Sequence, residues 1–165
     1  MANVQAGRHT AAHEGELVVF VIGMQVNSWW AIHRWWPVAM AMGPMISELY
    51  RNKELGFLDA QFLLSPRGPV TIQYWRSYED LENYARHGAK HLKAWKDYNR
   101  KAAAGSKHVG VFHETYMVDA GKYESVYVNT PKFGLGRASG LVPATGRRET
   151  ARRRLGGDNE PAVAE

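Results

Sequence analysis

The chain contains no cysteine. That absence excludes disulfide bonds, thiolate metal ligands and a cysteine nucleophile. The first residues do not combine a basic stretch with an apolar run, so the sequence does not predict a secretory signal peptide. The longest apolar stretches, near Leu17–Met24 and Trp35–Met45, fall short of the roughly 18–20 residues that span a bilayer. We therefore expect a cytoplasmic protein with no membrane insertion.

Common cofactor and catalytic motifs are missing as well. The sequence contains no Gly-rich phosphate loop, no dinucleotide-binding fingerprint and no G-x-S-x-G nucleophile elbow. A redox role would therefore depend on oxygen chemistry assisted by the substrate itself, or on haem. No Glu lies between His87 and His91 in a zinc-protease arrangement, so a hydrolytic zinc site is not predicted.

Tryptophan, by contrast, is abundant: the chain has six, and four of them fall between residues 29 and 36. Because exposing aromatic side chains is unfavourable, we expect these to line a core, a pocket or an interface. The net charge is +5 over 165 residues, and much of it comes from the C-terminal arginines Arg147, Arg148, Arg152, Arg153 and Arg154. That stretch has too few apolar residues to offset ordering entropy, so we expect a disordered Arg-rich tail over residues 141–165 and no nucleic-acid partner.

Hydrophobic patterning predicts one domain over residues 16–140, preceded by a flexible leader over residues 1–15. A β-branched run from Glu16 to about Val26 is typical of a buried strand. Residues 29–51 have helical spacing, and Gly43-Pro44 should kink or divide that helix. The other expected elements are a hairpin of strands at 57–64 and 70–75, a helix capped by Ser77 and interrupted at Gly88, a helix over 89–104, strands at 107–118 and 124–128, and an extended arm over 131–140.

The resulting order is β-α-β-β-α-β with an extra strand, which predicts a ferredoxin-like α+β fold. One antiparallel sheet would carry both helices on one face. Because the strands are strongly apolar, the other face also needs a cover, and pairing with a second copy is the simplest solution. We therefore expect a homodimer.

Several short segments resemble one family. Residues 74–82, Tyr-Trp-Arg-Ser-Tyr-Glu-Asp-Leu-Glu, resemble the W-x-S-x-E-x-L motif of the antibiotic-biosynthesis-monooxygenase superfamily. Residues 31–38, 91–95 and 109–116 are similar to a monooxygenase-like subfamily, formerly of unknown function, that includes a fungal polyene-cleaving monooxygenase. Phe133-Gly-Leu-Gly136 is similar to the C-terminal arm of that subfamily. The resemblance covers about residues 16–140.

The resemblance implies a dimeric α/β barrel and an enzyme that oxidises a hydrophobic, conjugated small molecule with O2, with no cofactor required. Other members of the superfamily bind haem, so a haem-dependent lyase or oxygenase similar to aldoxime dehydratase is the alternative. A third possibility is a dimeric protein that binds a small molecule without catalysis. Fold similarity does not choose among these functions.

The first candidate site residues are histidines. His87, His91 and Trp95 are spaced by four residues, so they share one helix face if the helix continues through Gly88. Alternation along the strand 107–118 places His113 and Glu114 on opposite faces, one toward a pocket under the helices and the other toward the dimer interface. His113 or His91 would be the general base, or the axial ligand if haem binds. The alternative is that His87 and His91 face water and that His113 is a hydrogen-bonded core residue.

The second group lies mainly where the first strand runs into the first helix. The resemblance implies that Asn27 orients the substrate anion or oxygen, and its alternative role is a helix cap. We expect Trp75 to support the hairpin, without a part in the reaction. The side chains expected to line the substrate pocket and exclude water are Trp30, His33, Trp36, Trp95, Phe112 and Tyr116.

Overall fold

The β-branched run at residues 17–26 forms a strand, β2 (Leu17–Val26), as predicted. The computed structural model describes residues 3–100 and 107–161. The chain divides into two units, which we call the central unit (residues 18–116) and the terminal unit (residues 1–17 and 117–165). β2 supplies most of its residues to the central unit.

The central unit contains a four-stranded sheet in the order β3-β4-β2-β5. Its further strands are β3 (Phe57–Ser65), β4 (Gly68–Trp75) and β5 (Val109–Val118). β4 pairs antiparallel with both β3 and β2. This order, with helices between β2 and β3 and between β4 and β5, is the ferredoxin-like arrangement, so the predicted fold class is confirmed.

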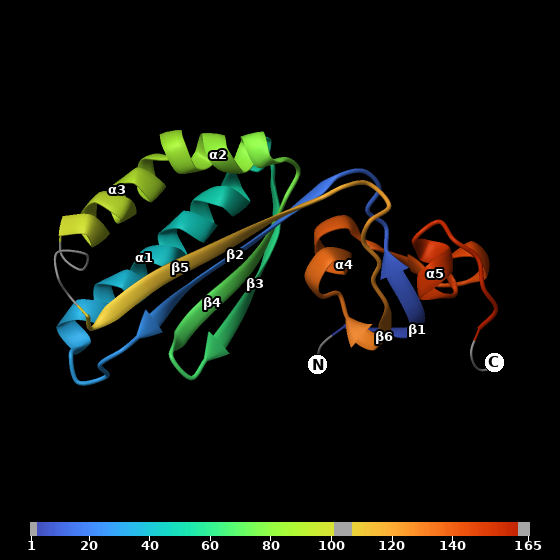
Figure 1. Cartoon of the computed structure of the whole chain (residues 1–165), viewed down its shortest axis with the longest axis horizontal. Coiled ribbons are helices and arrows are strands. Elements are labelled where there is room, and N and C mark those ends of the chain that lie inside the picture. Colours follow the sequence, from blue (N-terminus) through green and yellow to red (C-terminus); the bar gives the residue numbers. More distant parts are fainter. Residues whose placement is uncertain (1–2, 101–106, 162–165) are drawn as a thin grey trace. The chain divides into compact units, whose positions relative to one another are not determined.

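The helices α1 (Ile32–Arg51), α2 (Tyr78–His87) and α3 (Ala89–Tyr98) lie on one side of this sheet (Figure 1). A short 3-10 turn, η1 (Lys53–Leu55), connects α1 to β3. α1 is one helix that contains both Pro37 and Pro44, so Gly43-Pro44 does not divide it. Each proline removes only one backbone hydrogen bond, and the second half of α1 is anchored by Leu49, which is 1% exposed.

Two apolar clusters form the core of the central unit. One contains Trp75, Phe57, Tyr84 and their neighbours at one end of the sheet. The other, made of Met24, Val26 and Val109, lies against the partly buried Trp35 and Val38 of α1. Side chains of a strand alternate between faces, so Val18 in the first cluster and Met24 in the second are on the same face of β2. Phe20 and Ile22, which lie between Val18 and Met24 on that face, are not among the buried residues of either cluster.

The terminal unit has its own three-stranded sheet, in the order β6-β1-β7. Its elements are β1 (Val4–Ala11), β6 (Tyr127–Pro131), α4 (Gly134–Ser139), β7 (Leu141–Pro143), η3 (Gly146–Arg148) and α5 (Ala151–Arg154). β1 thus replaces the expected flexible leader, and β6 begins three residues later than the strand expected at 124–128. A helix, α4, occupies part of the expected extended arm.

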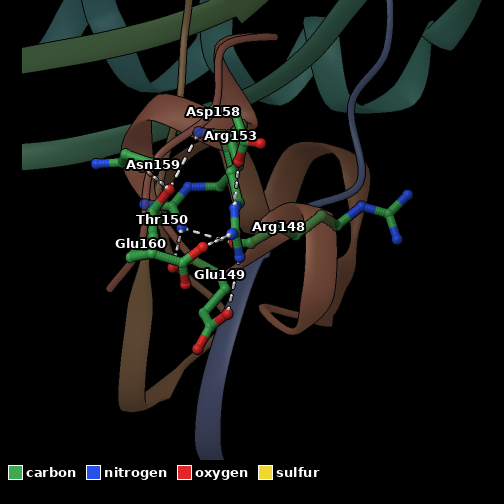
Figure 2. Close-up of polar contacts among 8 residues, drawn as sticks. Arg148, Glu149, Thr150, Arg153, Asp158, Asn159 and Glu160 are labelled. Carbon is green, nitrogen blue, oxygen red and sulfur yellow. Dashed lines mark hydrogen bonds and ion pairs between the residues drawn. The ribbon is translucent and has the colours of Figure 1, made fainter. Parts of the chain in front are cut away.

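Residues 141–161 also differ from the disordered tail that we expected. Arg153 forms ion pairs with Glu149, Asp158 and Glu160 at 2.9–3.3 Å, and these carboxylates surround its guanidinium (Figure 2). Arg154 has a side chain only 6% exposed and pairs with Glu124 at 2.7 Å. The arginine-rich stretch is therefore organised by ion pairs and hydrogen bonds instead of by an apolar core, a contribution that counting apolar residues overlooks.

Candidate functional site

A cavity of about 1350 Å³ lies within the central unit, lined by α1, α2, α3, β2 and β5. Its floor on β2 is Phe20 and Ile22, the two residues that alternation places between Val18 and Met24. The cavity therefore lies on the helix-covered face of the sheet, between the two core clusters. It is open to solvent, because lining residues such as Trp95 (53%) and Val111 (37%) remain exposed.

The wall on α1 follows helical spacing. His33, Pro37, Val38, Ala41 and Met45 recur at steps of one to four residues and all line the cavity. Most of this wall is apolar. The periodicity of α1 was visible in the sequence, but it did not show that this face borders an open cavity, because the same spacing also describes a face packed in a core.

Three of the candidate histidines line the cavity: His33 on α1, His91 and His113. His91 lies on α3, and its ring contacts that of Tyr84 with centroids 5.9 Å apart. Its Nδ1 is buried and has no hydrogen-bond partner among the described residues. His113 lies on β5, and its ring contacts Phe20 at 5.5 Å. The cavity thus has imidazoles both on its helical wall and on the sheet.

Tyr84 is the aromatic neighbour that contacts the His91 ring. Burial, together with the hydrogen bond that its hydroxyl donates to Glu48 at 3.0 Å, holds the pKa of Tyr84 well above its ordinary value. The phenol therefore stays neutral at neutral pH. Its ring also packs against Trp75, which is fully buried. A protonated, doubly packed Tyr84 gives His91 a fixed neighbour.

The break at Gly88 separates His87 from His91. α2 ends at His87 and α3 begins at Ala89, so the three residues spaced by four do not share one continuous helix. A Cβ at Gly88 would lie 2.6 Å from the backbone oxygen of Tyr84, which explains why glycine occupies the break. His87 is exposed, with Nδ1 3.2 Å from the carbonyl oxygen of Asn83, whereas His91 and Trp95 line the cavity.

His113 and Glu114 point to opposite faces of the sheet, as alternation predicts. Glu114 accepts a hydrogen bond from Tyr116 at 2.6 Å. Phe112 is on the same face as these two residues, since a Cβ at Gly23 would lie 2.8 Å from its ring. Phe112 and Tyr116 therefore lie on the face of the sheet away from the helices and do not line the cavity, which corrects the pocket set expected from the sequence.

The remaining candidates divide in the same way. His33 and Trp95 line the cavity, whereas Asn27, Trp30 and Trp36 do not. Asn27 is exposed at the end of β2, where its backbone amide donates to the carbonyl oxygen of His108 at 2.9 Å. Its side chain makes no cap on α1, whose N-cap position is Ala31. The sequence placed these residues near the first helix but could not show which side of it they face.

Cationic residues are part of the cavity lining as well. Five lysines and arginines line it, with only two acidic residues. Asp97 is paired with Lys93 and Arg100, each at 2.8 Å, and the other acidic residue, Glu82, is paired with Arg86 at 3.1 Å. These positions, including Arg34 and Lys90, were not among the residues expected from the sequence. The sequence did not mark these lysines and arginines as cavity residues, because similar residues cover the exposed surface of most helices.

The described part of the chain contains no group of three or more His, Asp or Glu side chains placed to hold a metal ion. In the same described residues, no helix is both long enough and apolar enough to cross a membrane. The lining of the cavity contains three imidazoles, those of His33, His91 and His113, together with mainly apolar side chains and five lysines and arginines.

The family model described as Monooxygenase af470-like matches residues 17–135 of this chain. The chain belongs to this family of monooxygenase-like proteins. A relative is Monooxygenase af470 from Aspergillus fumigatus, which is 33% identical over 170 aligned residues. The alignment covers 90% of this chain and 59% of the relative, so the chain spans about three-fifths of that protein's length.

Solved structures with a similar fold include two aldoxime dehydratases. One has a TM-score of 0.67 at 20% sequence identity, covering 82% of this chain and 40% of that protein. The other, OxdRE in complex with butyraldoxime, has a TM-score of 0.65 at 17% identity, covering 82% and 39%. At these identities the similarity concerns the fold alone. It does not support haem binding by this chain.

Proposed function

We propose that this protein is a monooxygenase that oxidises a hydrophobic, conjugated small molecule with O2 in the cavity between α1–α3 and the sheet, with no cofactor required. One observation carries the proposal: His91 and His113 line the same mainly apolar cavity in a chain that belongs to a monooxygenase-like family. An apolar pocket with a few convergent polar groups is a common setting for small-molecule chemistry.

In the proposed reaction, His113 or His91 removes a proton from an activated C–H or O–H group of the substrate. The resulting anion is electron-rich, because conjugation spreads its charge, and it transfers electrons to O2. A new C–O bond forms, the O–O bond then breaks, and the second oxygen atom leaves as water. Conversion of CH2 to C=O by one O2 balances in this way, because the substrate supplies the electrons.

The two histidines have different surroundings. His91 has a buried Nδ1 without a partner, so its proton transfer would use Nε2. His113 rests on Phe20 in the floor. The apolar walls would limit water near the substrate anion and so strengthen its interaction with an imidazolium. Asn27 lies outside the cavity lining, and we assign it no step.

The size and charge of the cavity also favour one kind of ligand. Its volume of about 1350 Å³ exceeds the roughly 300–1,000 Å³ typical of pockets for drug-sized molecules. The excess of lysine and arginine in its lining is complementary to an acidic group. A long conjugated chain with a carboxylate at one end fits both properties.

Oxygen uptake tests the proposal. The purified protein is mixed with conjugated polyenoic acids and electron-rich phenols, and O2 consumption and product mass are measured. We expect His113→Ala or His91→Ala to lower kcat by about 10²–10⁴-fold. His87→Ala is the matched control, since His87 is an exposed histidine outside the cavity lining, and it should retain activity.

The opposite outcomes are distinct. Binding of polyenoic acids without O2 uptake would favour a small-molecule binder. A Soret band in the freshly purified protein, lost in one histidine variant, would favour a haem enzyme. Equal activity of all three histidine variants would refute the assignment of the base.

We further propose that the protein acts as a homodimer through the sheet face away from the helices. Val19 and Val21 are on this face of β2, opposite to Val18 and Phe20, and Phe112 and Tyr116 belong to it on β5. Light scattering after gel filtration measures the mass. A monomer at all concentrations would refute the dimer, and Tyr116→Lys should weaken it.

A further inference from the structure

Three segments of the central unit meet at one end of it. They are the loop and helix start that follow β2 (residues 27–36), the end of β3 with its turn into β4 (residues 62–68), and the start of β5 (residues 107–109). Val26 donates a backbone hydrogen bond to Arg67 at 2.7 Å, and Asn27 donates one to His108 at 2.9 Å. Figure 1 shows the end of β2, the β3–β4 turn and the starts of α1 and β5 together. We call this surface the Trp end.

The Trp end exposes large apolar side chains. Leu64 is 81% exposed and Trp30 is 75% exposed, the two highest values for large apolar side chains among the described residues. The others at this end are Trp29, Ile32, Trp36, Phe62 and Leu63, each between 41% and 60% exposed. Such a concentration is unusual for a surface that only contacts water.

The tryptophans of the Trp end are held in place. The Trp30 ring packs edge-on against His108 with centroids 4.8 Å apart. Trp35 donates from its indole nitrogen to the carbonyl oxygen of Trp29 at 3.1 Å, and its ring contacts those of Trp29 and Trp36. Exposure at the Trp end is therefore a property of the fold, because inward-facing contacts fix the backbone that presents these rings.

The charge of the Trp end has one sign. None of the residues 27–36, 62–68 and 107–109 is acidic, and the first acidic residue of α1 is Glu48. Arg67 and Lys107 are exposed within these segments. Exposed tryptophans beside lysine and arginine, without acidic residues, are the composition of surfaces that lie in the headgroup region of anionic membranes.

We propose that the Trp end docks on the surface of an anionic lipid bilayer, with Trp30 and Leu64 inserted at the level of the headgroups. A bilayer fits better than a protein groove because the two most exposed side chains come from separate segments, the loop after β2 and the end of β3, and the charged residues beside them are all cationic. No spanning helix is needed for this mode of binding. Docking does not depend on the reaction proposed above.

Docking would also give the cavity a source of hydrophobic ligand. His33 and Arg34 line the cavity, and both belong to the segment of the Trp end that starts α1. A molecule dissolved in the bilayer could then reach the cavity along the start of α1 without crossing water. This route, unlike docking, rests on the proposed function.

Vesicle sedimentation tests the docking. The full chain is mixed with vesicles of phosphatidylcholine alone, or of equal parts phosphatidylcholine and phosphatidylglycerol. We expect binding to the anionic vesicles, a blue shift of the tryptophan emission, and quenching by brominated lipid. The double variant Trp30→Ser, Leu64→Ser should bind the anionic vesicles at least about tenfold more weakly than the wild type, because both inserted apolar side chains are lost.

Matched variants separate the apolar and charged contributions. Met117→Ser removes an apolar side chain that is 70% exposed outside the Trp end and should leave binding unchanged. Arg67→Glu with Lys107→Glu should weaken binding to anionic vesicles, whereas Lys53→Glu, an exposed lysine before β3, should not. Circular dichroism checks that each variant folds.

Three outcomes would overturn the proposal. The first is that the wild-type protein stays in the supernatant with anionic vesicles. The second is that the Trp30→Ser, Leu64→Ser variant sediments like the wild type. The third is that this variant has a lower oligomeric mass in solution than the wild type, which would make the Trp end an interface between copies. Loss of docking with normal O2 uptake from a soluble substrate would leave the proposed function intact.

Discussion

Trp75 belongs to the motif that carries the family resemblance, and its environment predicts a structural role. It is fully buried, and its ring contacts those of Phe57 and Tyr84 with centroids 5.4 and 5.8 Å apart. Its indole nitrogen donates to Oε1 of Gln73 at 3.0 Å. Trp75→Phe removes both the hydrogen bond and part of the ring.

The expected loss of stability has two parts. Replacing the indole by the smaller ring costs about 1–3 kcal/mol in lost apolar burial and cavity formation. Leaving Oε1 of Gln73 unpaired costs about 1–3 kcal/mol more, because Gln73 is only 5% exposed. The sum, about 2–6 kcal/mol, is a large part of the roughly 5–15 kcal/mol that stabilises a typical domain.

Urea unfolding followed by circular dichroism measures this loss. The double variant Trp75→Phe, Gln73→Leu removes the acceptor together with its donor, so the two single changes should not add and the coupling should be about 1–2 kcal/mol. A loss below about 1 kcal/mol for Trp75→Phe, or strict additivity in the double variant, would refute the reasoning.

Two further predictions concern glycine and an ion pair. Gly23→Ala should destabilise the protein by about 1–3 kcal/mol, because its Cβ would lie 2.8 Å from the Phe112 ring. Gly43→Ala should instead stabilise the protein by about 0.5–1 kcal/mol, because Gly43 lies within α1 and its Cβ would enter open space. Equal effects of the two substitutions on the thermal melting temperature would contradict both predictions. The hydrogen bond from Arg153 holds the pKa of Asp158 below its ordinary value. The contribution of this pair is therefore present above about pH 4 and is lost as the pH falls through the lowered pKa. The protection factors of the α5 amides, which correct for slower intrinsic exchange at lower pH, should fall over that range in the wild type but show no such acid step in Asp158→Asn; identical pH profiles of the two proteins would argue against it.

The sequence by itself determined the ferredoxin-like order of elements, because long β-branched runs, helical spacing and turn residues act locally. The same local rules predicted the cap at Ser77, whose Oγ accepts from the amide of Asp80 at 3.2 Å. Alternation also predicted that His113 and Glu114 face opposite sides of the sheet, since adjacent strand residues always do.

Only the tertiary structure decided which candidates meet. The break at Gly88 separates His87 from His91, and the position of α1 decides that His33 lines the cavity while Trp30 does not. These outcomes depend on how helices pack on the sheet, which spacing along the chain does not encode.

The terminal unit shows the same limit. β1 pairs with β6 and β7, whose residues lie more than 110 positions further along the chain. Strands of this kind have weak local signals and gain their hydrogen bonds only when distant segments meet. The sequence therefore determined what each segment of the central unit is, whereas folding decided which side chains share a cavity and that the two chain ends form a sheet.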